Sequence, residues 1–67
     1  MNSIAKQAAL EIIGAINENV ELFNAEVMSA LYNNNKSANR RSRKQSIMLR
    51  SQIKELRKLL LAIEKEQ

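Results

Sequence analysis

Residues that break helices are almost absent from this chain of 67 residues, which contains no proline and a single glycine, Gly14. Proline and glycine mark most turns, so a chain without them has few places at which a helix can end. The one break is the run Asn33, Asn34 and Asn35, because asparagine tolerates left-handed backbone angles and its side chain bonds nearby backbone groups. The sequence therefore predicts two long helices joined by a turn at these asparagines.

Apolar residues on both sides of the asparagines recur at alternating intervals of three and four, the repeat of a helix that packs along a seam. We predict one helix over residues 3–33, a turn at about 33–37 and a second helix over 37–66, with Ser3 and Ser37 as N-caps. A short connection between long helices favours an antiparallel hairpin. The expected fold class is all-α, one helical hairpin over residues 1–67. Its predicted seam consists of Ala9, Ile13, Ile16, Val20, Phe23, Val27 and Ala30 in the first helix and Ser42, Ser46, Leu49, Ile53, Leu56, Leu60 and Ile63 in the second.

The chain has more apolar residues than one seam can hold. A chain this short buries a small fraction of its surface, and without cysteine no disulfide can supplement the core. A second hairpin would cover the surplus, so we expect a homodimer with a four-helix bundle of coiled-coil type. Gly14 either allows a close helix crossing or is a tolerated residue that lowers helix stability by about 1 kcal/mol relative to alanine. We favour the crossing. The surplus residues are Leu10, Ile12, Leu22, Met28, Leu31, Tyr32, Met48, Leu59 and Leu61.

Charge divides the chain at the asparagines. Residues 1–33 hold one lysine against four glutamates, a net charge of −3, whereas residues 34–67 hold ten basic and three acidic residues, a net charge of +7. The overall charge of +4 favours a polyanionic partner, with nucleic acid first and an anionic membrane second. The candidate DNA-binding residues are Lys36, Arg40, Arg41, Arg43, Lys44, Arg50, Lys54 and Arg57.

A basic helix face can also be a solvated surface that binds nothing. Two features favour phosphate binding. No acidic residue lies between Lys36 and Lys44, so their mutual repulsion has no local counter-charge. Arginine outnumbers lysine in this cluster, and its guanidinium binds phosphate oxygens in a bidentate manner.

Catalysis is not expected. The chain has no histidine and no cysteine, and Glu18 with Glu21 has the spacing of ordinary surface residues. We expect no enzyme activity, no cofactor, no metal site and no small-molecule substrate. No apolar run approaches the ~20 residues of a membrane-spanning helix, and no signal peptide is recognisable. A cytoplasmic protein is therefore expected.

The stretch from Asn35 to Lys44, NKSANRRSRK, resembles the signature of the bacterial linker-histone-like nucleoid proteins of the chlamydial type. In that family the stretch that corresponds to residues 34–44 usually reads GNKAAGTRARK, so Asn34 and Asn39 replace glycine here and Arg40 replaces threonine. The later stretch IKELRK, residues 53–58, resembles the second helix of the same family. The residues that match the signature are Asn35, Lys36, Ala38, Arg41, Arg43 and Lys44.

The resemblance covers about half the chain and implies a nucleoid-associated helical protein that binds duplex DNA without sequence preference and compacts it. Arg41, Arg43 and Lys44 are the first candidates for phosphate contacts, because both the charge cluster and the resemblance select them. Two other functions remain open. One is an RNA-binding hairpin dimer, similar to the plasmid copy-number Rop proteins, and the other is a phage or assembly protein that docks on an acidic partner. The expected location is the nucleoid, or packaged viral DNA if the chain is encoded by a phage.

Overall fold

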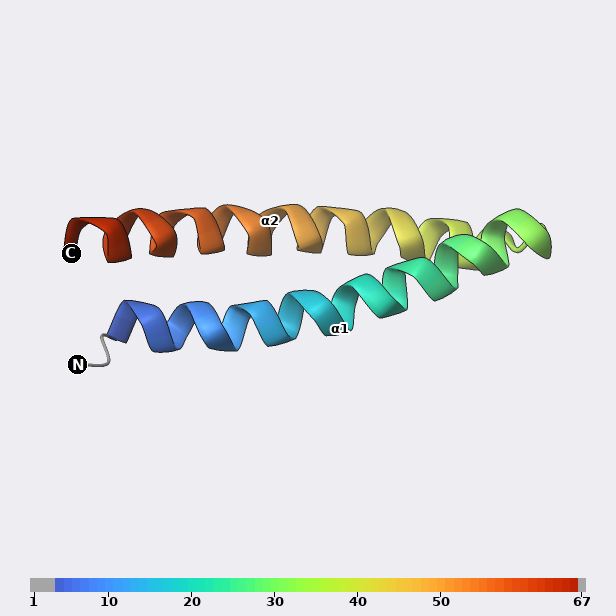
Figure 1. Cartoon of the computed structure of the whole chain (residues 1–67). Helices are drawn as coiled ribbons and strands as arrows, with labels where there is room; N and C mark the ends of the chain where they lie inside the picture. Colours follow the sequence, from blue (N-terminus) through green and yellow to red (C-terminus); the bar gives the residue numbers. More distant parts are fainter. Residues whose placement is uncertain (1–3, 67) are drawn as a thin grey trace.

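The computed structural model describes residues 4–66, which form an antiparallel hairpin of two helices (Figure 1). Helix α1 runs from Ile4 to Tyr32 and helix α2 from Lys36 to Glu66. The hairpin is elongated, with extents of 49 × 15 × 12 Å. The predicted all-α hairpin is confirmed. Neither helix, over residues 4–66, contains a stretch long and apolar enough to cross a membrane.

The asparagine run forms the turn, as its residue type predicts. The backbone amide of Asn33 donates to the Ser29 carbonyl at 3.0 Å and completes α1. Asn34 then adopts the left-handed region, with φ of 51°. Asn35 Oδ1 accepts a hydrogen bond from the Ala38 amide at 3.0 Å and caps the start of α2.

The prediction of Ser37 as the N-cap is therefore wrong, because α2 begins at Lys36 and Ser37 already lies inside its first turn. Asn35 stands immediately before the helix, in the position from which a side chain can reach a free first-turn amide. The other predicted cap, Ser3, lies outside the described residues.

The two helices touch along a line that differs from the predicted seam by one residue at several places. Ile13 and Val20 are 41% and 38% exposed, and Ile53 and Leu60 are 48% and 54% exposed. Their neighbours on the chain are more deeply buried and occupy the seam instead. These neighbours are Ile12 and Asn19 in α1, and Gln52 and Leu59 in α2.

Two polar side chains of this seam are hydrogen-bonded to each other across the hairpin. Asn19 Nδ2 donates to Gln52 Oε1 at 2.9 Å, so two amides share a site that apolar side chains fill elsewhere. Gln45 Oε1 is an exception: it is buried and has no hydrogen-bond partner among residues 4–66. Such a group carries a desolvation cost. The seam therefore contains polar residues, at Asn19 and Gln52 and at Gln45, where apolar side chains would be more stabilising.

Small residues let the helices converge at the turn. Ala38 is fully buried and Ser42 is 8% exposed, whereas Ile16 and Leu49 fill the seam farther away. Figure 1 shows the two helix axes meeting near the turn and separating toward the termini. Gly14 takes no part in this approach, because no heavy atom lies within 4 Å of the place where its Cβ would stand. The expectation of a helix crossing at Gly14 is wrong for this hairpin.

Candidate nucleic-acid interface

All eight candidate DNA-binding residues lie on α2 and are exposed. Successive residues of an α-helix are rotated by about 100°, so position along α2 fixes the direction of each side chain. On this basis six of the eight point into one arc of about 100° on the outer side of the helix. We call this set the basic stripe; its members are Lys36, Arg40, Arg43, Arg50, Lys54 and Arg57.

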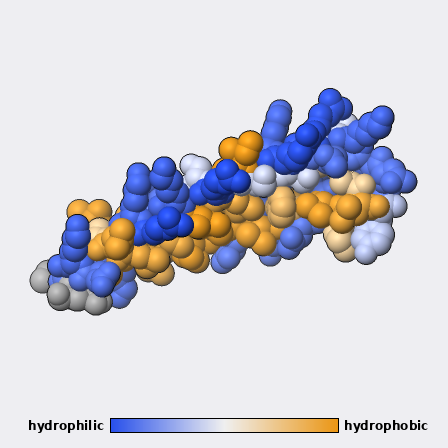
Figure 2. Space-filling model, turned by 90° about the horizontal axis from the view of Figure 1, so that it is seen from above, coloured by the Kyte–Doolittle hydropathy of each residue, from blue (hydrophilic) through white to orange (hydrophobic). Residues whose placement is uncertain are grey.

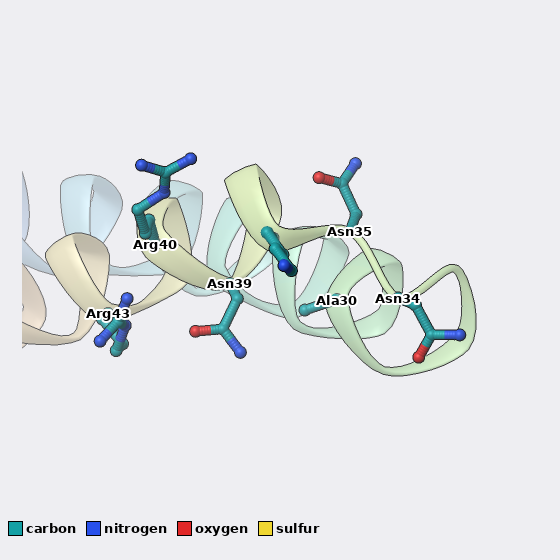
Figure 3. A pocket seen from close by; sticks show the side chains of 7 residues that line it. Ala30, Asn34, Asn35, Asn39, Arg40 and Arg43 are labelled. Atoms are coloured by element: carbon teal, nitrogen blue, oxygen red, sulfur yellow. The ribbon is translucent and has the colours of Figure 1, made fainter.

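At the turn the basic stripe borders a hollow of about 610 Å³. Three cations and three asparagines contribute to its walls, so charged donors and neutral amide donors border the same hollow. Figure 3 shows Arg40 and Asn35 along one edge, Arg43, Asn39 and Asn34 along the other, and Ala30 between them. Such a set of N–H donors is suited to an anion with several oxygen acceptors, such as a phosphate. The lining residues are Ala30, Asn34, Asn35, Lys36, Asn39, Arg40 and Arg43.

A second hollow, of about 470 Å³, lies farther along the hairpin. Its floor is apolar, with Phe23 from α1 facing Leu49 and Ile53 from α2. Its rim carries the other three members of the basic stripe, Arg50, Lys54 and Arg57, together with Ser46. The stripe therefore continues from a polar hollow at the turn to the cationic rim of an apolar one.

Arg41 lies apart from the stripe. Arg41 and Arg43 are two residues apart and so point about 200° away from each other around α2. The Arg41 guanidinium donates from Nε to Glu26 Oε1 of α1 at 3.0 Å. The Arg41 side chain is 55% exposed and that of Glu26 is 26% exposed. This ion pair joins the two helices and occupies one of the cations that a phosphate could use.

The structure therefore places the three first candidates for phosphate contacts in different surroundings. Arg43 lines the polar hollow, Arg41 is paired with Glu26, and Lys44 lines neither of the two hollows. Of the three asparagines at the hollow, the sequence predicts Asn34 and Asn35 only as turn residues, and Asn39 only as a replacement of the family's glycine. Their place beside the cations is not predicted. For Asn39 a signal existed, because it lies three residues after Lys36 and four before Arg43, on the same face of a helix.

Two serines of α2 are held by the helix itself. Ser42 Oγ donates to the Asn39 carbonyl at 2.8 Å, and Ser46 Oγ donates to the Arg43 carbonyl at 2.7 Å. Both bonds reach back one turn along α2, a common arrangement for hydroxyls in helices. These hydroxyls therefore have backbone partners within the helix.

Comparison with known proteins gives one family. The family described as Histone H1-like protein Hc1 matches residues 11–66, which include most of α1, the turn and all of α2. No curated protein and no solved structure matches the chain.

Proposed function

Because this chain belongs to the histone H1-like protein Hc1 family, a family of DNA-binding structural proteins and not of enzymes, we propose that it binds duplex DNA through the basic stripe and compacts it in the nucleoid. The observation that carries this proposal is the alignment of six exposed cations along one side of α2. The family match covers most of α1 and all of α2, so it supports the resemblance over a longer part of the chain.

The length of the stripe suits contact with several phosphates. Lys36 and Arg57 are 21 residues apart, which is about 32 Å along a helix at ~1.5 Å per residue. Phosphate contacts fix the position of a protein on DNA but carry no direct sequence information. We therefore propose binding with little sequence preference, in which the hollow at the turn holds one phosphate and the rest of the stripe follows the backbone.

The experiment is a salt titration of binding to duplex DNA. Neutralising about five or six phosphates predicts a log–log slope near −5, at roughly −0.9 per contact. Two double variants remove equal charge from the same region. Arg40→Gln with Arg43→Gln removes stripe residues, whereas Arg41→Gln with Lys44→Gln removes residues outside it.

We expect the stripe variant to flatten the slope by about two contacts and its matched control by less than one. Equal slopes for the two variants would contradict the stripe, and binding that does not change with salt would contradict phosphate contact altogether. Random duplexes should bind alike. Preferential capture of structured RNA over duplex DNA would favour the RNA-binding alternative.

We further propose that the chain acts as a homodimer. Large apolar side chains are exposed on both helices of the single hairpin, including Leu10, Leu22 and Leu61. Exposed apolar surface of this extent is typical of proteins that associate. Sedimentation at micromolar concentration should give the mass of two chains, and a folded monomer at that concentration would contradict the proposal.

A further inference from the structure

Both helices carry an apolar row beside the seam, on the same side of the hairpin. Each residue of these rows directly follows a seam residue in the sequence. Val20, for example, follows Asn19 in α1, and Ile53 follows Gln52 in α2. The residue after a seam residue is rotated about 100° around its helix. Because the helices are antiparallel, this rotation turns both rows toward the same side of the hairpin. The hollow formed by Phe23, Ser46, Leu49 and Ile53 lies on that side and shows that the two helices share it. We call this surface the apolar face; it consists of Ile13, Val20, Val27, Ser46, Ile53 and Leu60.

Figure 2 shows hydrophobic residues forming a band along the length of the molecule, with hydrophilic side chains standing along its border. The basic stripe borders the apolar face on the α2 side, since Arg50 and Arg57 rim the same hollow. Within this hairpin four members of the face remain between 38% and 54% exposed: Ile13, Val20, Ile53 and Leu60. The face is thus long, open and flanked by charge on one side.

We propose that a second copy of this chain covers the apolar face, turned end for end, so that the two turns lie at opposite ends of the dimer. The proposal rests on the DNA binding proposed above only for its last step, the bridging of two duplexes. It specifies which surface pairs and in which direction, and both follow from the register of the two helices.

The apolar face matches itself when it is turned end for end. The Asn19–Gln52 hydrogen bond places Val20 and Ile53 near one level, at the middle of the face. Ile13 and Leu60 lie about two helical turns to one side of this level, and Val27 and Ser46 lie as far to the other side. End-for-end pairing sets the large Leu60 over the small Ser46 of the second copy, and the reverse at the other end. Pairing with the turns at one end would stack Ile13 on Leu60 and leave Ser46 against Val27, which packs one end too tightly and the other too loosely.

The residues that border the face on α1 follow the same symmetry. Leu10, Asn17, Asn24 and Leu31 recur at intervals of seven along α1. End-for-end pairing brings α1 beside α1 of the second copy, with Leu10 next to its Leu31 and Asn17 next to its Asn24. Leu10 and Leu31 are 65% and 68% exposed in the single hairpin, so this pairing covers two large apolar side chains.

Charge favours the same direction. The pairing keeps the two cationic turns far apart, well beyond the Debye length of about 8 Å at physiological salt. On α2 it sets Arg50 beside Arg57 of the second copy, at a rim where solvent and DNA phosphates reach both side chains. With both turns at one end, Arg43 would face Leu31 and the two clusters would repel each other.

Such a dimer presents a phosphate-binding turn at each end. One dimer then holds two DNA segments, or two distant parts of one molecule, and each end binds independently. Compaction of DNA follows from this bridging.

The direction of pairing is tested by distances between labels. The chain has no cysteine, so Tyr32→Cys and Glu21→Cys each give one labelling site per copy. In the proposed dimer the Tyr32 labels lie about 35 Å apart along the axis, because each is about 12 residues from the centre at ~1.5 Å per residue. The Glu21 labels lie near the centre, at a separation set by the helix spacing of about 10 Å and the label arms.

A long distance at position 32 with a short one at position 21 is the expected result. Similar distances at the two positions would place the turns at the same end and overturn the proposal, and so would a monomer under the same conditions. These measurements are made without DNA. Failure of DNA binding would therefore overturn the proposed function and leave the pairing direction standing.

Bridging is tested with a duplex fixed to beads and a second, fluorescent duplex in solution. The wild-type dimer should capture the second duplex. The variant Val20→Gln with Ile53→Gln removes the centre of the apolar face and leaves the basic stripe unchanged. We expect this variant to keep its helix content and its binding to a single duplex, but to become monomeric and lose the capture. A wild-type dimer that captures no second duplex, or a monomeric variant that still does, would overturn the bridging step.

Discussion

Asn19 of α1 and Gln52 of α2 form a hydrogen bond of 2.9 Å across the middle of the hairpin. The same Asn19 amide also lies 3.5 Å from the Met48 sulfur. Two amides at a seam position pack less favourably than two leucines. They can form a hydrogen bond with each other only when they stand at the same level along the two helices. The pair therefore favours one register of α2 along α1.

Replacing Asn19 by leucine should lower the free energy of unfolding by about 1 kcal/mol, because Gln52 loses its partner in a partly buried place. Replacing both residues by leucine should restore the loss and exceed the wild-type value, since the apolar seam then continues through this level. Urea unfolding followed by helix content measures both effects. Gln7→Leu, on the exposed side of α1, is the control and should change little. Equal effects of the single and double variants would mean that the hydrogen bond contributes nothing.

The N-cap of α2 can be tested by two matched substitutions. Asn35→Ala removes the acceptor of the Ala38 amide and should cost about 1 kcal/mol of stability. Ser37→Ala, two residues along, removes a hydroxyl inside the first turn and should be neutral or slightly stabilising, because alanine is the better helix former. Thermal unfolding of both variants gives the comparison. A larger loss of stability for Ser37→Ala would show that Ser37, and not Asn35, is the N-cap of α2.

The hairpin could be predicted from the sequence because two physical signals agree. Apolar periodicity extends through both halves, and only the asparagine run offers a backbone that can turn. The exact seam could not be predicted this way, since Val20 and Ile53 fit a spacing of three and four as well as Asn19 and Gln52 do. A rule based on hydrophobicity selects the more apolar pair. The structure uses the amides, because each finds its partner on the other helix.

The basic stripe, too, could be predicted from the sequence only in part. Its location on the second helix follows from charge alone, and helix geometry could have shown that Arg41 and Arg43 point in opposite directions. The pairing of Arg41 with Glu26 depends on the register of two distant segments. A single sequence does not reveal that register, so charge and the family resemblance select Arg41, Arg43 and Lys44 as one group.

Gly14 offers a direct gain in stability. Its missing Cβ would meet nothing within 4 Å, so alanine fits without strain. Gly14→Ala should raise the free energy of unfolding by about 1 kcal/mol through helix propensity. Denaturant unfolding measures this increase, and DNA binding should stay the same because Gly14 lies on α1, away from the basic stripe. A loss of stability would show that a side chain at this position meets a surface that the single hairpin does not contain.

The ion pair between Arg41 and Glu26 predicts a separate effect on DNA binding. Glu26→Gln removes the carboxylate that holds the Arg41 guanidinium and leaves this cation free to meet a phosphate. The salt dependence of binding should then steepen by up to one contact, roughly −0.9 in slope. Stability should fall by less than about 1 kcal/mol, because the pair is partly exposed to solvent. Glu21→Gln removes the same charge from the exposed side of α1 and is the matched control. It should strengthen binding slightly through the general change in charge, with no change in slope. If the two variants bind DNA with equal affinity and equal slope, Glu26 does not compete with phosphate for Arg41.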